Sequence, residues 1–277
     1  MRLVLLVGHT FNAEVQHRYV AARLAAEFPT ELVAVVVATG LPQSPVAKAR
    51  KWLRRYTPAQ IVSRTLAQIH RRLSRASEQR HRKLSEILFP DGEDGEMPGG
   101  NLVHRVVSHN SAECRELLRR LRPDIVAVYG TLIIGRKLID SVPKMLNIHT
   151  GLSPAYRGSD TIFWALHNSQ PEQVGVTVHR VDAGVDSGAI LARGRPAIEP
   201  GDDEDRLFAK SVQLGADLLC RAIRREFNAS AQPLMQDLNS GLEYRSVQRT
   251  LAAERRVRKL LRAGLVSEAR SQWSEEF

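Results

Sequence analysis

Short, continuous apolar runs alternate with helix-like stretches along this sequence, and this alternation constrains the possible folds more than any other feature. Residues 3–7 and 32–37 are uninterrupted apolar runs, typical of strands that are buried on both faces of a parallel sheet. Between them, residues 17–28 carry apolar side chains at helical spacing. This strand–helix–strand order predicts the beginning of an α/β fold.

The same alternation returns after residue 100 and continues almost to the end of the chain. We expect five further strands, at residues 102–107, 125–130, 145–149, 174–181 and 189–198. We expect helices at residues 112–121 and from Asp203 to residue 227, where acids in the first turn suit the helix dipole. The sequence therefore predicts a mostly parallel sheet with flanking helices, followed by a partly helical tail.

The positive charge of the chain is concentrated in one segment. The net charge is +10 at pH 7, a value that by itself suggests nucleic-acid binding. Residues 48–83, however, contain 12 Lys or Arg and a single acid, Glu78, so the rest of the chain is close to neutral. Four apolar residues in this segment lie on one helical stripe: Val62, Leu66, Ile69 and Leu73. We interpret residues 43–100 as a basic helical insert and a loop.

Cysteine usage and hydropathy exclude several classes of protein. Cys114 and Cys220 lie far apart and form no C-x-x-C pair, which argues against a zinc ribbon, a thioredoxin-like motif and a disulfide framework. The longest nearly apolar run, residues 125–134, has 10 residues, whereas a spanning helix needs roughly 20. The apolar run at the start is too short for a signal peptide. We expect a cytoplasmic protein without a transmembrane segment or a metal.

Polar residues at the ends of buried strands form the candidate site. Ligands of open α/β sheets bind beyond the carboxyl ends of the strands. Asn147 and His149 share one face of such a strand end, and Asp186 lies in a glycine-rich loop after another strand. The Asn amide can donate to a developing oxyanion, the His can donate or transfer a proton, and the Asp can accept the proton of an amine. These residues predict acyl transfer to an amine from an activated carrier.

The sequence around this pair resembles a known family. Residues 147–158 read Asn-Ile-His-Thr-Gly-Leu-Ser-Pro-Ala-Tyr-Arg-Gly, which is similar to the N-x-H signature of the 10-formyltetrahydrofolate-dependent formyltransferases. Thr150-Gly151 departs from the Pro-Ser that family members often have after the His. The resemblance is strong over residues 102–215, weaker over 1–40 and absent over 43–100. Three flanking segments follow in the family's order and spacing: residues 123–124, 163–166 and 175–188.

The resemblance implies a Rossmann-like formyltransferase fold with 10-formyltetrahydrofolate as the formyl donor. It implies that Asn147 and His149 polarise the formyl oxygen and that Asp186 assists proton transfer. The folate would be held by two turns, with these residues: Leu132, Ile133, Gly135, Asp182, Ala183 and Gly184. From their own positions rather than from the resemblance, His9 and Asn12, at the end of the first strand, and Arg157 are candidates to contact the acceptor. From the residues alone, Asp182 also suits a turn, Arg157 also suits an anchor for its own loop, and we place His179 in the wall or core.

The acceptor is expected to be a small-molecule amine. The first loop, residues 8–12, lacks the glycine-rich phosphate cradle of the purine-pathway family member. The residues after 227 are too few for the β-barrel of the tRNA-directed member, so we expect no tRNA. We prefer a nucleotide-linked amino sugar, and an ornithine-type or other metabolite amine stays open. We divide the chain into a catalytic domain, residues 1–227, and an extension, residues 228–277, and a homo-oligomer is possible.

Two alternative functions stay open at this point. The same three residues could activate water and hydrolyse formyltetrahydrofolate. Alternatively, the basic residues 48–83 could bind a nucleic acid or another anionic surface, which would give strongly salt-dependent binding.

Overall fold

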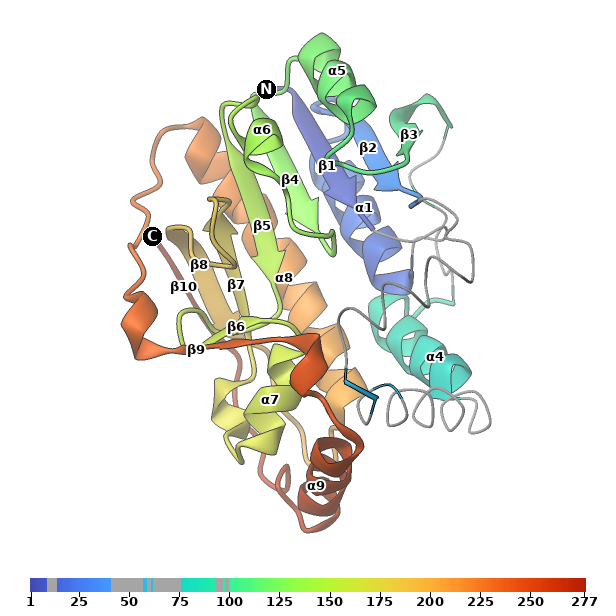
Figure 1. Cartoon of the computed structure of the whole chain (residues 1–277), viewed down its shortest axis with the longest axis vertical. Coiled ribbons are helices and arrows are strands. Elements are labelled where there is room, and N and C mark those ends of the chain that lie inside the picture. The colour runs from blue at the N-terminus through green and yellow to red at the C-terminus, as the bar shows by residue number, and fades with distance from the viewer. Residues whose placement is uncertain (9–13, 41–56, 59–60, 62–75, 93–96, 98–99) are drawn as a thin grey trace.

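A single large sheet runs through the molecule (Figure 1). The computed structural model describes residues 1–8, 14–40, 57–58, 61, 76–92, 97 and 100–277. In this part of the chain, eight strands follow the order β10–β8–β7–β5–β4–β1–β2–β3. These strands are β1 (Leu3–Val7), β2 (Leu32–Ala38), β3 (Val103–Val106), β4 (Ile125–Tyr129), β5 (Met145–His149), β7 (Val176–Arg180), β8 (Ile190–Arg195) and β10 (Trp273–Glu276).

The direction of the strands changes at β5. From β5 through β4, β1 and β2 to β3, neighbouring strands are parallel. Strand β7 is antiparallel to β5, β8 to β7 and β10 to β8. The mostly parallel α/β architecture expected from the sequence is thereby confirmed, and β5 is the strand at which the two pairing modes meet.

The apolar runs are continuous because the sheet is covered on both faces. In β1, Leu3, Leu5 and Val7 pack in one core cluster, whereas Val4 and Leu6 pack in another. Helices α1 (Val15–Glu27), α4 (Ala76–Leu88) and α8 (Glu204–Phe227) cover the first face. Helices α5 (Ala112–Leu121) and α6 (Arg136–Ile139) supply the second cluster. The expected cap of α8 is confirmed, since the Asp203 side chain accepts a hydrogen bond from Arg206 N–H.

Residues 228–277 pack against the rest of the protein at several places. Strand β9 (Leu242–Tyr244) pairs in parallel with β6 (Tyr156–Gly158), and β10 joins the main sheet. Tyr244 stacks between Tyr156 and Trp164, with ring centroids 5.6 and 4.9 Å apart, and Asn168 donates hydrogen bonds to both tyrosine hydroxyls. A third core cluster forms around α7 (Thr161–His167) and α9 (Leu251–Arg262).

Four short 3₁₀ helices complete the described elements: Gly100–Leu102, Pro171–Gln173, Leu238–Ser240 and Ser246–Gln248. Within the described ranges, no helix is long and apolar enough to cross a membrane. The same residues contain no cluster of His, Cys, Asp or Glu suited to a metal ion.

Most of the basic segment 48–83, including the stripe from Val62 to Leu73, lies outside the described residues. Its described part includes the start of α4, where Arg80 pairs with Asp205 at 2.5 Å and Lys83 pairs with Asp203. These two cations are therefore partly neutralised by the first turn of α8.

Gly215 permits close packing of α8 on the sheet beneath the polar end of β5. A Cβ at this position would lie 2.7 Å from Val176 Cγ2 and 2.8 Å from Ile148 Cγ2. We expect Gly215→Ala to lower the free energy of unfolding by about 1–3 kcal/mol through overpacking, despite the gain in helix propensity of up to about 1 kcal/mol. Denaturant unfolding measures this change. Adding Val176→Ala should recover part of the loss, and a rise in stability for Gly215→Ala alone would contradict the packing.

Candidate active site

The pairing of β5 with β7 brings polar side chains together at the carboxyl end of β5. Asn147 lies opposite His179, and His149 lies opposite Thr177. Because side chains alternate along a strand, Asn147 and His149 lie on one face of β5, and the His179 side chain reaches Asn147 across the strands. The distance from Asn147 Nδ2 to His179 Nε2 is 3.1 Å.

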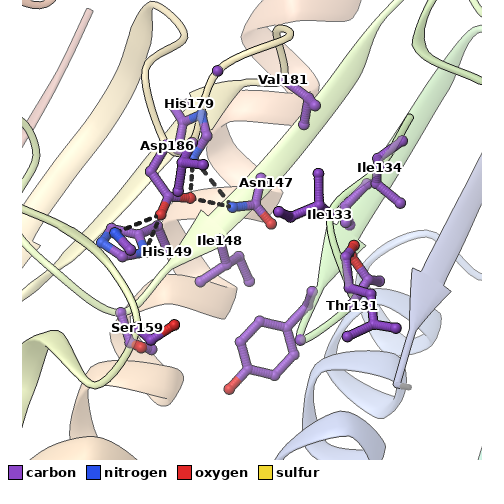
Figure 2. A pocket seen from close by; sticks show the side chains of 18 of the residues that line it. Thr131, Ile133, Ile134, Asn147, Ile148, His149, Ser159, His179, Val181 and Asp186 are labelled. Carbon is purple, nitrogen blue, oxygen red and sulfur yellow. Dashed lines mark hydrogen bonds and ion pairs between the residues drawn. The ribbon is translucent and has the colours of Figure 1, made fainter. Parts of the chain in front are cut away.

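The Asp186 carboxylate lies between these side chains (Figure 2). Its Oδ2 is 3.2 Å from His149 Nδ1 and accepts a hydrogen bond from Gly158 N–H at 3.0 Å. Its Oδ1 is 3.4 Å from His179 Nε2 and 3.5 Å from Asn147 Nδ2. Four groups from β5, β6 and β7 therefore surround one carboxylate.

These neighbours keep Asp186 ionised. Burial alone would raise the pKa of the Asp186 carboxyl, because a low-dielectric environment disfavours the charged form. The charge of His149, the hydrogen bond and charge of His179, and the Gly158 N–H act in the opposite direction and hold the pKa well below its usual value. The carboxylate is therefore a fixed negative charge against which a cation can form.

Both histidine rings are held in defined orientations. In His149, Nε2 lies 2.9 Å from the Tyr156 carbonyl oxygen while Nδ1 faces Asp186, so a ring that carries both protons donates at both nitrogens. In His179, Nδ1 lies 2.7 Å from the Arg180 carbonyl oxygen, and Nε2 lies 3.1 Å from Asn147 Nδ2 and 3.4 Å from Asp186 Oδ1. Space beside His149 is limited, because a Cβ on Gly151 would lie 2.5 Å from Nε2.

A cavity of about 650 Å³ opens beside this cluster. Asn147, His149 and Asp186 line it together with the two segments expected to hold a folate. Leu132 and Ile133 line it with 66% and 75% of their surface exposed. Asp182 and Gly184 also line it, whereas Gly135 and Ala183 are not among the lining residues.

Other candidate residues have local partners. Asp182 Oδ1 accepts hydrogen bonds from Gly184 N–H at 3.0 Å and from the Ser187 hydroxyl at 2.7 Å, which is turn chemistry. Arg157 is buried and donates to the Leu238 carbonyl at 3.1 Å, and it does not line the cavity. His9 and Asn12 lie outside the described residues.

The contacts of His179 and the contribution of residues 243–246 and α1 were not expected from the sequence. His179, which we placed in the wall or core, is buried in the wall and contacts both Asn147 and Asp186. The sequence feature at His179 is the alternation of apolar and polar residues over 176–179, which predicts a strand but does not determine its register with β5. Residues 243–246 and the start of α1 also line the cavity. Nothing in the local sequence of residues 243–246 points to a site.

Comparisons with known proteins agree with this geometry. Residues 58–223, more than half of the chain, match the formyl transferase family, so the chain belongs to that family. A methionyl-tRNA formyltransferase of Caldanaerobacter subterraneus is 30% identical over 155 residues, which are 55% of this chain and 50% of that protein. The chain thus spans about half, or less, of the length of the curated relatives that it matches.

Two solved structures share the fold. A sugar N-formyltransferase from Shewanella sp. superposes with a TM-score of 0.55 at 16% identity, covering 93% of this chain and 87% of that one. Phosphoribosylglycinamide formyltransferase from Bacillus halodurans gives a TM-score of 0.50 at 18% identity, covering 82% and 95%. At these identities the likeness concerns the architecture alone.

The lowered pKa of Asp186 links stability to pH. The carboxylate stabilises the fold fully above the unfolded-state pKa, about 3.9 for Asp, and this contribution is lost as the pH falls toward the lower folded-state pKa. We expect the melting temperature of the wild type, relative to Asp186→Asn, to increase from about pH 2.5 to about pH 5 and then to level off. Asp91→Asn, at an exposed carboxylate, is the control. A difference that does not vary with pH would contradict the ion-pair geometry.

Proposed function

We propose that this member of the formyl transferase family transfers a formyl group from 10-formyltetrahydrofolate to the primary amine of a small molecule. The observation that carries the proposal is the convergence of Asn147, His149 and an ionised Asp186 on the wall of one cavity. Acyl transfer to an amine requires oxyanion donors beside a group that accepts a proton.

In the proposed reaction, the amine nitrogen attacks the formyl carbon, and a negative charge develops on the formyl oxygen. The Asn147 amide carries two hydrogens; one can be donated to Asp186, and the second is assigned to the formyl oxygen. A protonated His149 adds positive charge beside the same centre. The bond from the formyl carbon to N10 of the folate then breaks, the amine loses a proton toward Asp186, and N10 gains one.

The folate is assigned to the part of the cavity between residues 131–134 and 182–185. Leu132 and Ile133 are large apolar side chains that are mostly exposed, and they would become buried against a flat heterocycle. The opposite loop contributes Asp182 and Gly184 to the lining of the cavity. The folate is a substrate that is consumed in each turnover.

The acceptor is assigned to the opposite side, where residues 243–246 form the wall. Among the described residues that line the cavity, Arg245 is the only Lys or Arg, and its Nε lies 3.2 Å from Glu243 Oε1. A guanidinium suits a phosphate or carboxylate group. A nucleotide-linked amino sugar, which carries phosphate groups, stays the preferred acceptor, and the carboxylate of an ornithine-type amine would suit the same side chain.

Formyl transfer is tested under single-turnover conditions with 10-formyltetrahydrofolate and a panel of amines. The panel contains nucleotide-linked amino sugars, ornithine-type amines and methionyl-tRNA. We expect transfer to a small-molecule amine, and rate constants about 10²- to 10³-fold lower for His149→Ala and Asp186→Asn. Asp91→Asn should match the wild type.

Three results would contradict this proposal. Formate release without any amine would indicate hydrolysis, and transfer to methionyl-tRNA alone would replace the acceptor class. Full activity in both His149→Ala and Asp186→Asn would remove the mechanism.

Arg245 gives a separate prediction about the acceptor. Arg245→Ala should raise KM for a phosphate-bearing acceptor by roughly tenfold, about 1.4 kcal/mol, and leave kcat and the KM for the folate nearly unchanged. Arg119→Ala is the matched control, because Arg119 is equally exposed and pairs with Glu116 on α5, away from the cavity. An unchanged KM in Arg245→Ala would exclude this residue from acceptor binding.

A further inference from the structure

An extended segment after α8 returns to the loop that carries Asp186. Leu234 and Ile190 exchange two backbone hydrogen bonds of 2.8 Å each. Gln236 Nε2 donates to the carbonyl oxygens of Asp186 at 3.0 Å and Gly188 at 2.6 Å. The Leu238 carbonyl oxygen also accepts a hydrogen bond from a buried side chain of β6. Every second residue of this segment, at positions 234, 236 and 238, therefore contacts β8, the Asp186 loop or β6.

The contact of Leu238 leads to the strand that donates a hydrogen bond to the Asp186 carboxylate. The buried side chain is Arg157, whose neighbour Gly158 donates its N–H to Asp186 Oδ2. The segment 234–238 thus holds both the loop that carries the carboxylate and the strand that donates to it. Neither contact touches the cavity, because residues 234–238 are not among those that line it.

The Asp186 loop needs such support. Asp186 has a φ of 48°, in the left-handed region that costs a non-glycine residue free energy. Gly188 lies so close to the Arg180 carbonyl that no Cβ would fit there. Two carbonyl oxygens that face one side chain require a donor with two hydrogens, which the amide of Gln supplies and a carboxylate does not.

We propose that Gln236 is a positioning residue that fixes the Asp186 carboxylate against His149 and Asn147. Residue 236 lies beyond the part of the chain that matches the family, residues 58–223. The catalytic consequence of this assignment rests on the proposed function, whereas its structural consequence does not. The site would then depend on a segment that follows the matched region.

The test compares Gln236→Met with Met235→Ala in the full-length protein. Gln236→Met keeps the length of the side chain and removes both donors. Met235 is the matched control, because it is the adjacent residue, is 78% exposed and does not line the cavity. Three quantities are measured: kcat and KM for formyl transfer, the melting temperature, and the NMR signal of the His149 Nδ1 proton, which requires no substrate.

We expect Gln236→Met to lower kcat by roughly 10- to 100-fold, because small displacements of a reacting group are costly, with KM nearly unchanged. The exchange-protected, downfield signal of His149 Nδ1–H should be lost in Gln236→Met and kept in Met235→Ala, while both variants stay folded at 25 °C.

A normal kcat and an intact Nδ1–H signal in Gln236→Met would overturn the assignment. So would equal losses in Met235→Ala. If the wild type transfers no formyl group to any amine but the Nδ1–H signal still disappears in Gln236→Met, the proposed function fails and the positioning role stands. A second variant, Gln236→Glu, keeps the shape of the side chain and should resemble Gln236→Met at neutral pH.

Discussion

Burying the Asp186 carboxylate is costly, and the surrounding donors offset that cost. The side chain reaches His149, His179 and Asn147, and it accepts the N–H of Gly158. Without the carboxylate, His149 Nδ1 loses the oxygen that lies 3.2 Å from it. The orientation of each polar group at the site is therefore coupled to this one ionised side chain.

The fold supplies these partners through the change of strand direction at β5. The parallel half of the sheet places the carboxyl end of β5 beside that of β4, where an α/β fold opens its ligand site. The antiparallel half pairs β7 with β5 and sets Asn147 opposite His179. The loop between β7 and β8 then returns Asp186 to the same point. Close packing of α8 at Gly215 supports β5 and β7 from below.

The local sequence predicts seven of the eight strands of the main sheet, but not β10, β6 or β9. It also singles out Asn147, His149 and Asp186, whose catalytic roles stay a proposal. The apolar runs are continuous because both faces of the sheet are covered, and the N-x-H pattern placed Asn147 and His149 on one strand face. The contacts of His179 depend on strand register, which pattern alone does not determine. Strand β9 and Gln236 act through contacts with residues more than 40 positions away, so their local sequence carries no signal of their place.

The fold also changes the view of the residues after α8. These residues build one wall of the cavity, stack Tyr244 between two aromatic rings and reach both sides of the Asp186 carboxylate. The division into a catalytic domain, residues 1–227, and an extension, residues 228–277, stays a proposal. The two parts share packing and hydrogen bonds. In the proposed reaction, this wall would contact the acceptor.

The most direct test of this account is a crystal structure of the full chain with a stable formyl-folate analogue. We expect the pterin to lie between residues 131–134 and 182–185. We also expect the formyl oxygen to lie within hydrogen-bond distance of Asn147, with Asp186 on the side open to the acceptor. A folate bound outside this cavity, or a formyl group directed away from Asn147 and Asp186, would contradict it.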